Sequence, residues 1–84
     1  MARISVYGTD WCGFCEAAKS LLEERGIPYE DIDISDEPAF RQRVFDMSGR
    51  WTVPLVVIDG RPVGGYVELR ELDRSGRLGE LIAA

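Results

Sequence analysis

Two cysteines, Cys12 and Cys15, are the residues of this chain best suited to chemistry, and the chain has no other cysteine and no histidine. Cys12 is predicted to lie at or just before the first turn of a helix. There, unpaired backbone N–H groups and the helix dipole favour a thiolate over a thiol. Cys15 then lies one turn along the same face, in a position to attack a mixed disulfide formed at Cys12. The spacing predicts thiol–disulfide exchange, with Cys12 as the nucleophile and Cys15 as the resolving thiol.

Two other interpretations of the cysteine pair remain open. A zinc site takes four ligands, so two thiolates without histidine would need a second chain to complete it. An inert buried pair is the other alternative, but it explains neither the spacing nor the position of the cysteines. A structural disulfide is disfavoured, because so short a loop removes little entropy from the unfolded chain. Redox or cluster chemistry is the favoured interpretation.

Length and charge limit the remaining possibilities. A chain of 84 residues predicts a single domain over 1–84, without room for a separate substrate domain. The formal charge of −5 argues against nucleic acid or an anionic membrane as the main partner. Residues 1–8 lack the apolar core of a signal peptide, and no apolar stretch approaches the roughly 20 residues that span a bilayer. We therefore expect a cytoplasmic protein, in which cellular reductants keep thiols reduced.

The elements that must position the cysteines follow from hydrophobic periodicity. Residues 4–7 are β-prone, and a helix is predicted from Cys15 to a stop at Gly26. Residues 29–34 alternate isoleucine with acids, the period of a strand. A second helix is predicted from a cap at Ser35 or Asp36 to a stop at Gly49. Its apolar face would carry Phe40, Val44 and Met47.

The second half of the chain predicts a hairpin followed by a helix. Residues 54–65 read as two short strands around an Asp59-Gly60 turn. A helix is predicted from about Val67 to Arg74, with a break at Gly76. A short terminal turn then carries Leu78, Leu81 and Ile82. The predicted order is β-α-β-α-β-β-α.

Three motifs at these spacings resemble the glutaredoxins over essentially the whole chain: CGFC at 12–15, TVP at 52–54 and GGYVEL at 64–69. The resemblance implies an α/β, thioredoxin-like fold with a four-stranded mixed sheet flanked by helices. It also implies that Pro54 is cis and faces the cysteines, which leaves the backbone of Val53 free to pair with a peptide-like substrate. A proline that simply begins a strand is the alternative.

The resemblance further implies that glutathione is a co-substrate. Its γ-glutamyl carboxylate would meet the main-chain groups of Tyr66 and Val67, with Glu68 near the ligand ammonium. Many glutaredoxins have a lysine where this chain has Thr9, so Arg50 is the candidate partner of the glycyl carboxylate, and a solvated Arg50 is the alternative. The implied glutathione-binding residues are Phe14, Arg50, Thr52, Val53, Pro54, Gly65, Tyr66, Val67 and Glu68.

The family pattern also predicts what surrounds the chemistry. Trp11 and Trp51 would flank the thiols as part of a docking surface, or else pack in the core. The expected partners are glutathione and disulfide-bearing or glutathionylated proteins, with no nucleic acid, no membrane and no obligatory metal. The protein is expected to be a monomer.

Two alternative functions remain. One is a redoxin reduced by thioredoxin reductase. The other is a [2Fe–2S] cluster carrier, because CGFC differs from the CGFS of monothiol glutaredoxins only at Cys15. Cys12 would then ligate the cluster in a glutathione-ligated homodimer.

Overall fold

The computed structural model describes residues 3–50 and 52–83, without the side chains of Phe40 and Ala83. The predicted order of elements is confirmed, and the final turn is a helix of its own. The elements are β1 (Ile4–Gly8), α1 (Gly13–Glu24), β2 (Glu30–Asp33), α2 (Phe40–Ser48), β3 (Leu55–Ile58), β4 (Arg61–Gly64), α3 (Tyr66–Arg74) and α4 (Arg77–Ala83).

The four strands form one mixed sheet in the order β2-β1-β3-β4. Strand β1 pairs in parallel with β2 and antiparallel with β3, and β3 and β4 form the predicted antiparallel hairpin. Asp59 and Gly60 have φ angles of 51° and 80°, the left-handed values that a tight hairpin turn needs. Because β1 is an inner strand, the loop at its carboxyl end leads from the middle of the sheet directly into α1.

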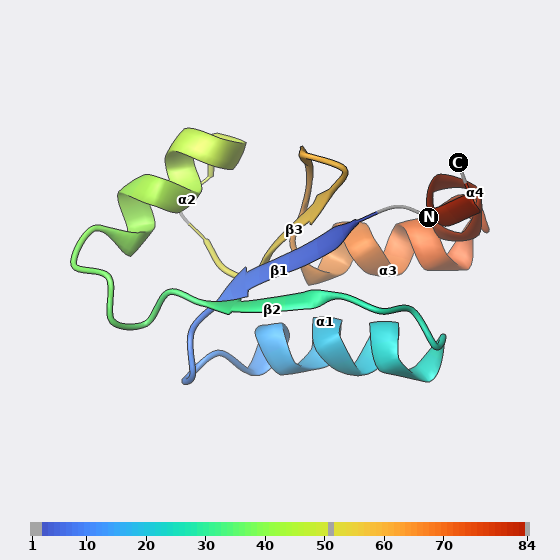
Figure 1. The fold of residues 1–84 in the computed structure, drawn as a ribbon, viewed down its shortest axis with the longest axis horizontal. Coiled ribbons are helices and arrows are strands. Elements are labelled where there is room, and N and C mark those ends of the chain that lie inside the picture. The colour runs from blue at the N-terminus through green and yellow to red at the C-terminus, as the bar shows by residue number, and fades with distance from the viewer. Residues whose placement is uncertain (1–2, 51, 84) are drawn as a thin grey trace.

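Alternation along the strands produces a core on each face of the sheet. Ile4 and Val6 of β1 pack with α1, α3 and α4, whereas Tyr7 faces the other side, toward Val44 of α2 and Leu55 of β3. Figure 1 shows the resulting layers, with α1 and α3 on one face of the sheet and α2 on the other. Strand β1 and helix α1, which flank the cysteine pair, therefore both contribute to the larger core.

The start of α2 differs from the prediction. Neither Ser35 nor Asp36 caps it, because the helix begins at Phe40 after Ala39. Pro38 explains the difference, since the residue before a proline is driven out of the helical region. The Ser35 hydroxyl instead accepts a hydrogen bond from the N–H of Asp10, 2.9 Å away, and so ties this segment to the loop before Cys12.

Smaller differences concern where the other helices begin. Helix α1 begins at Gly13 rather than Cys15, and α3 at Tyr66 rather than Val67. Gly13 and the exposed Phe14 carry no core side chain, so hydrophobic periodicity does not register the start of α1. These two residues bring Cys12 to the helix terminus.

Candidate active site

Cys12 is the N-cap residue of α1. Its backbone is extended (φ −100°, ψ 111°), and its sulfur accepts a hydrogen bond from the N–H of Cys15 at 3.2 Å. As a thiol it also donates to the carbonyl of Val53, 3.7 Å away. Both cysteines are free thiols. The Cys12 sulfur thus occupies the position at which a helix terminus stabilises negative charge.

Cys15 differs from Cys12 in its surroundings. Only 1% of Cys15 is exposed, and it lies against Gly8 at the end of β1. Burial and, second, the hydrogen bond with Cys12 together raise the pKa of the Cys15 thiol to about 12, against the opposing effects of the Thr9 backbone and of Lys19. At neutral pH Cys15 is therefore a thiol, and Cys12 is the cysteine within reach of a substrate.

Pro54 follows a cis peptide bond with Val53, as the resemblance implies. It stands directly before β3, so its missing N–H removes no ladder hydrogen bond. The carbonyl of Val53 faces the sulfur of Cys12. The loop before β3 therefore lies beside the N-terminus of α1, although some forty residues separate them in the chain.

A groove of about 250 Å³ joins this loop to the N-terminus of α3. It is lined by all the residues expected to bind glutathione except Arg50: Phe14, Thr52, Val53, Pro54, Gly65, Tyr66, Val67 and Glu68. The N–H groups of Tyr66 and Val67 lie in the first turn of α3, where a helix offers its donors no internal acceptor. The groove therefore presents donors suited to an anion.

Arg50 lies at the edge of this groove. It does not line the groove, and it is paired with a side chain that does. Its Nη1 is 3.1 Å from Oε1 of Glu68, and the same oxygen accepts a hydrogen bond from the N–H of Gly65 at 2.6 Å. Glu68 therefore caps its own helix and holds the guanidinium beside it. A ligand with both an ammonium and a carboxylate would meet the two partners of this ion pair.

Aromatic side chains surround Cys12. Trp11 and Phe14 are 65% and 64% exposed, which excludes core packing for Trp11. Phe14 stacks on Tyr66, with ring centroids 6.1 Å apart. The prediction for Trp51 falls outside the described residues. Val67, 61% exposed, extends the apolar surface across the groove.

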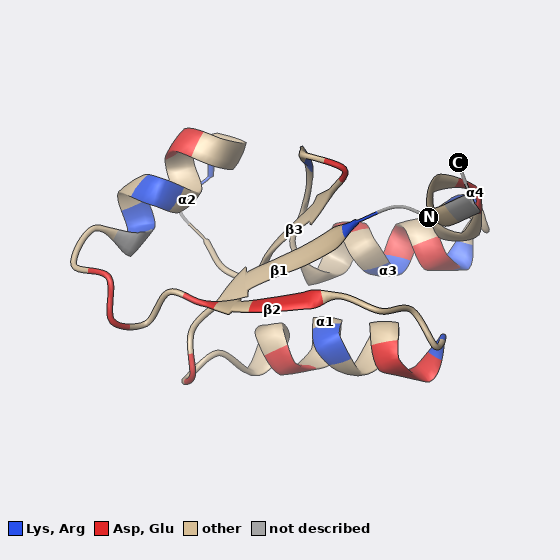
Figure 2. Ribbon diagram, in the orientation of Figure 1, with Lys and Arg blue, Asp and Glu red and all other residues tan. Residues whose placement is uncertain are grey.

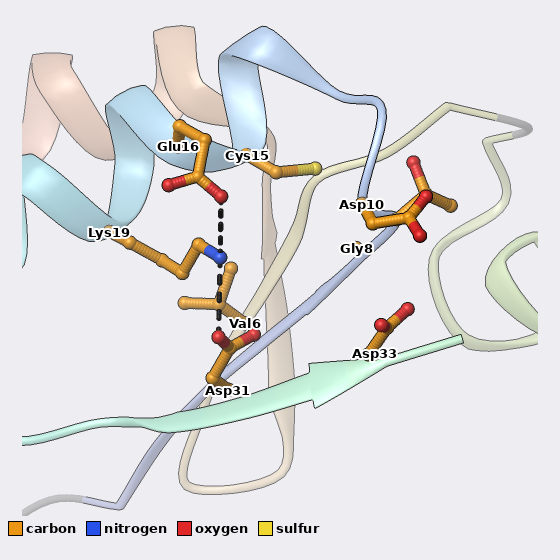
Figure 3. A pocket seen from close by; sticks show the side chains of 9 residues that line it. Val6, Gly8, Asp10, Cys15, Glu16, Lys19, Asp31 and Asp33 are labelled. Atoms are coloured by element: carbon orange, nitrogen blue, oxygen red, sulfur yellow. Dashed lines mark hydrogen bonds and ion pairs between the residues drawn. The ribbon is translucent and has the colours of Figure 1, made fainter. Parts of the chain in front are cut away.

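A second pocket, of about 150 Å³, lies behind Cys15, and the sequence did not predict it. It contains Lys19, whose amino group lies between the carboxylates of Glu16 and Asp31 (Figure 3). The spacing of Cys15 and Lys19, four residues apart on a helix, is the sequence signal that could have drawn attention to it. The approach of Asp31 depends on the pairing of β2 with β1 and has no local signal.

The described residues offer neither a metal site of their own nor a membrane-spanning helix. Within residues 3–50 and 52–83, no three or more acidic, cysteine or histidine side chains are grouped so that they could hold a metal ion. A cluster bound at Cys12 would thus need ligands from outside this part of the chain. Among the same residues, no helix has the length and apolar character to cross a membrane.

The family model described as Glutaredoxin matches residues 4–63. The chain belongs to the glutaredoxin family. Glutaredoxin 3 of Escherichia coli K12 is 35% identical over 82 residues, covering 98% of this chain and 99% of the relative. Glutaredoxin of Pseudomonas aeruginosa is 34% identical over 84 residues, covering both chains completely.

Solved structures agree with this assignment. A buckwheat glutaredoxin–glutathione complex superposes with a TM-score of 0.89, at 28% identity, covering 98% of this chain and 77% of that one. The holo form of glutaredoxin C1 from a poplar hybrid, Populus tremula x tremuloides, gives a TM-score of 0.88 at 27% identity, covering 98% of this chain and 77% of that one. This glutaredoxin is a thiol–disulfide oxidoreductase with a thioredoxin-like fold.

Proposed function

We propose that this glutaredoxin uses glutathione to reduce protein disulfides and glutathionylated mixed disulfides. The observation that carries the proposal is the groove that runs from Val53 beside Cys12 to the N-terminus of α3. A tripeptide whose sulfur reaches Cys12 would extend along this groove toward the free N–H groups of α3. The similarity to the buckwheat glutaredoxin, which forms a complex with glutathione, supports the same assignment.

Cys12 is the proposed nucleophile in both reactions. Its thiolate attacks the glutathione sulfur of a mixed disulfide, and the substrate thiol leaves with the electron pair and takes a proton from water. A second glutathione thiolate then attacks the glutathione sulfur bonded to Cys12, which releases glutathione disulfide and restores the Cys12 thiolate. On a protein disulfide, Cys15 instead resolves the mixed disulfide formed at Cys12.

The groove supplies binding groups of three kinds. Main-chain atoms of Thr52 and Val53 would pair with the ligand backbone, beside the ring of Pro54. The N–H groups of Tyr66 and Val67 would receive the γ-glutamyl carboxylate, because they combine free donors with the positive end of α3. The remaining proposed contacts are Glu68 to the ammonium, Arg50 to the glycyl carboxylate, and Phe14 and Gly65 as walls.

The proposal is tested by the source of electrons. Turnover of a glutathionylated protein is measured in two assays. One contains NADPH, glutathione and glutathione reductase, and the other contains NADPH and thioredoxin reductase. We expect turnover with the first system. Turnover with the second system alone would overturn glutathione dependence and support the redoxin alternative.

We propose cluster binding as a second candidate function, on the observation that a Cβ at Gly13 would meet no described atom within 4 Å beyond its chain neighbours and the backbone of its own helix. The backbone beside Cys12 is therefore open to a bound sulfide. Two chains and two glutathiones would supply four thiolates. Anaerobic reconstitution with iron, sulfide and glutathione should then yield a coloured dimer, and Gly13→Pro should suppress it. A colourless monomer from the unmodified chain would refute this candidate.

A further inference from the structure

The pocket behind Cys15 is lined by polar groups that have no role in the reaction proposed above. It lies between the end of β1, the first turns of α1 and the facing part of β2 (Figure 3). Cys15 borders it from α1, and carboxylates approach from the loop (Asp10), from α1 (Glu16) and from β2 (Asp31 and Asp33). The buried sulfur of Cys15 therefore has a polar space on the side away from the substrate groove.

Lys19 is the one cation among the described residues that line this pocket, and it is the only lysine in the chain, whose other basic residues are all arginines. Its side chain is 17% exposed, and its Nζ lies 2.9 Å from Glu16 Oε1 and 3.2 Å from Asp31 Oδ2. The hydrogen bonds from Lys19 to these carboxylates, Glu16 first, raise its pKa above the usual range. Figure 2 shows how acidic the surrounding parts of α1 and β2 are. Lys19 is thus a fixed ammonium.

The same pocket offers a route for a proton. Thr9 is buried, and its Oγ1 has no hydrogen-bond partner among the described residues. A polar cavity of about 150 Å³ has room for water, which an unpaired hydroxyl can bind. The backbone of Thr9 also forms a hydrogen bond with the Cys15 thiol that lowers its pKa, as does the charge of Lys19.

We propose that Lys19, held by Glu16 and Asp31, is a positioning residue for the resolving step, in which its ammonium stabilises the thiolate of Cys15. Cys15 loses its proton to water in the pocket and attacks the Cys12 sulfur. The Cys12–substrate disulfide breaks, and the substrate thiol leaves with the electron pair. Lys19 serves as a charge rather than a base, because an ammonium has no lone pair to accept the proton.

The size of the effect follows from the helix. Side chains four residues apart have Cβ atoms about 5–6 Å apart, and a full unit charge at that distance near a protein surface changes a pKa by about two units. The carboxylates of Glu16 and Asp31 offset part of the charge of Lys19, so we take an effect of about one unit. Attack requires the thiolate, so neutralising Lys19 should slow resolution about tenfold. The rate of the first attack, by Cys12, should change less. Negative charge on the Cys12 sulfur is stabilised by the N-terminus of α1 and by the hydrogen bond from the Cys15 N–H.

The inference rests on the proposed roles of the two cysteines but not on glutathione, so dithionitrobenzoate is the probe. One equivalent is mixed with the reduced protein in a stopped-flow spectrophotometer at pH 7. Attack by Cys12 releases one coloured thiolate, and attack by Cys15 on the resulting mixed disulfide releases the second. The two phases report the two cysteines separately.

We expect Lys19→Gln to slow the second release about tenfold relative to the first. Lys19→Arg keeps the charge and should restore most of the rate. The matched control is Arg25→Gln, which removes an exposed cation paired with Asp73 at the far end of α1 and should change neither phase. If Lys19→Gln does not fold, Lys19→Met is the second variant, because it removes the charge and keeps an unbranched side chain in the pocket.

Three results would overturn the inference: an unchanged second phase, equal slowing of both phases, or the same loss in Lys19→Arg as in Lys19→Gln. A first release that survives in Cys12→Ser would instead reject the proposed roles of the cysteines. Failure of the glutathione assays with two intact phases would reject glutathione dependence and leave the role of Lys19 standing.

Discussion

The backbone N–H of Cys15 donates a hydrogen bond to the sulfur of Cys12 across 3.2 Å. The proposed resolving residue therefore supports the proposed nucleophile through its main chain, while its own side chain is buried. This separation of backbone and side-chain roles makes substitutions at the two cysteines unequal.

Cys15→Ser keeps this N–H, so we expect it to retain reduction of glutathionylated proteins and to lose direct reduction of protein disulfides. Cys12→Ser removes the attacking sulfur and should abolish both reactions. The two activities are measured in parallel with a glutathionylated protein and a disulfide-bonded protein. Equal loss in the two variants would contradict the assigned roles.

Gly8→Ala should destabilise the protein, because a Cβ there would lie 2.6 Å from the sulfur of Cys15 and 3.1 Å from its Cβ. Overpacking of this kind costs about 1–3 kcal/mol of the free energy of unfolding, measured in urea. Gly13→Ala is the matched control, since its Cβ would meet no described atom within 4 Å. In a Cys15→Ala background the cost of Gly8→Ala should fall. An unchanged cost would show that the sulfur is not the obstacle.

Stability should depend on pH through Cys15. Its folded-state pKa, about 12, lies above the ordinary value of 9.0, so the folded protein holds this proton more tightly than the unfolded chain. This contribution is fully present below pH 9 and is lost as pH rises toward 12. Reduced protein should lose about 1 kcal/mol per pH unit in this range relative to Cys15→Ala. Parallel pH profiles of the two proteins would contradict the prediction.

Arg50→Gln should raise the KM for a glutathionylated substrate about fivefold, because the guanidinium beside Glu68 is the proposed partner of a ligand carboxylate and a partly exposed charge pair contributes about 1 kcal/mol. Arg61→Gln, which removes an exposed arginine at the start of β4, is the control. Steady-state kinetics with varied substrate measure both. A KM that is the same in the two variants would remove Arg50 from the binding site.

The sequence predicted the order of the elements well, because the period of the apolar residues and the stops at Gly26 and Gly49 are local signals. It did not predict the start of α2. Ser35 resembles a helix cap, but Pro38 and the hydrogen bond to Asp10 give this residue another environment. The sequence could not predict this hydrogen bond, because it forms only when the fold places the loop before Cys12 beside Ser35.

The groove beside Cys12 and the pocket behind Cys15 differ in how much of them the sequence could predict. The groove joins three distant segments, and only the family motifs indicated that they meet. The pocket depends on the ion pair between Asp31 of β2 and Lys19 of α1. The sequence around either residue gives no indication that the two elements meet there. Sequence reasoning therefore found the thiols but not the charge behind the second thiol.

The division of the apolar residues between the two faces of the sheet has a dynamic consequence. Helix α2 is attached through the smaller core of Ile34, Val44 and Leu55, and its first turn has no side-chain cap. Its amides should exchange with deuterium through local opening, whereas those of α1 should exchange only on global unfolding. The loop that carries Val53 follows α2, while Cys12 is anchored to α1. The reacting sulfur would thus be held by the slowly exchanging half of the molecule, and one wall of the groove by the half that opens first.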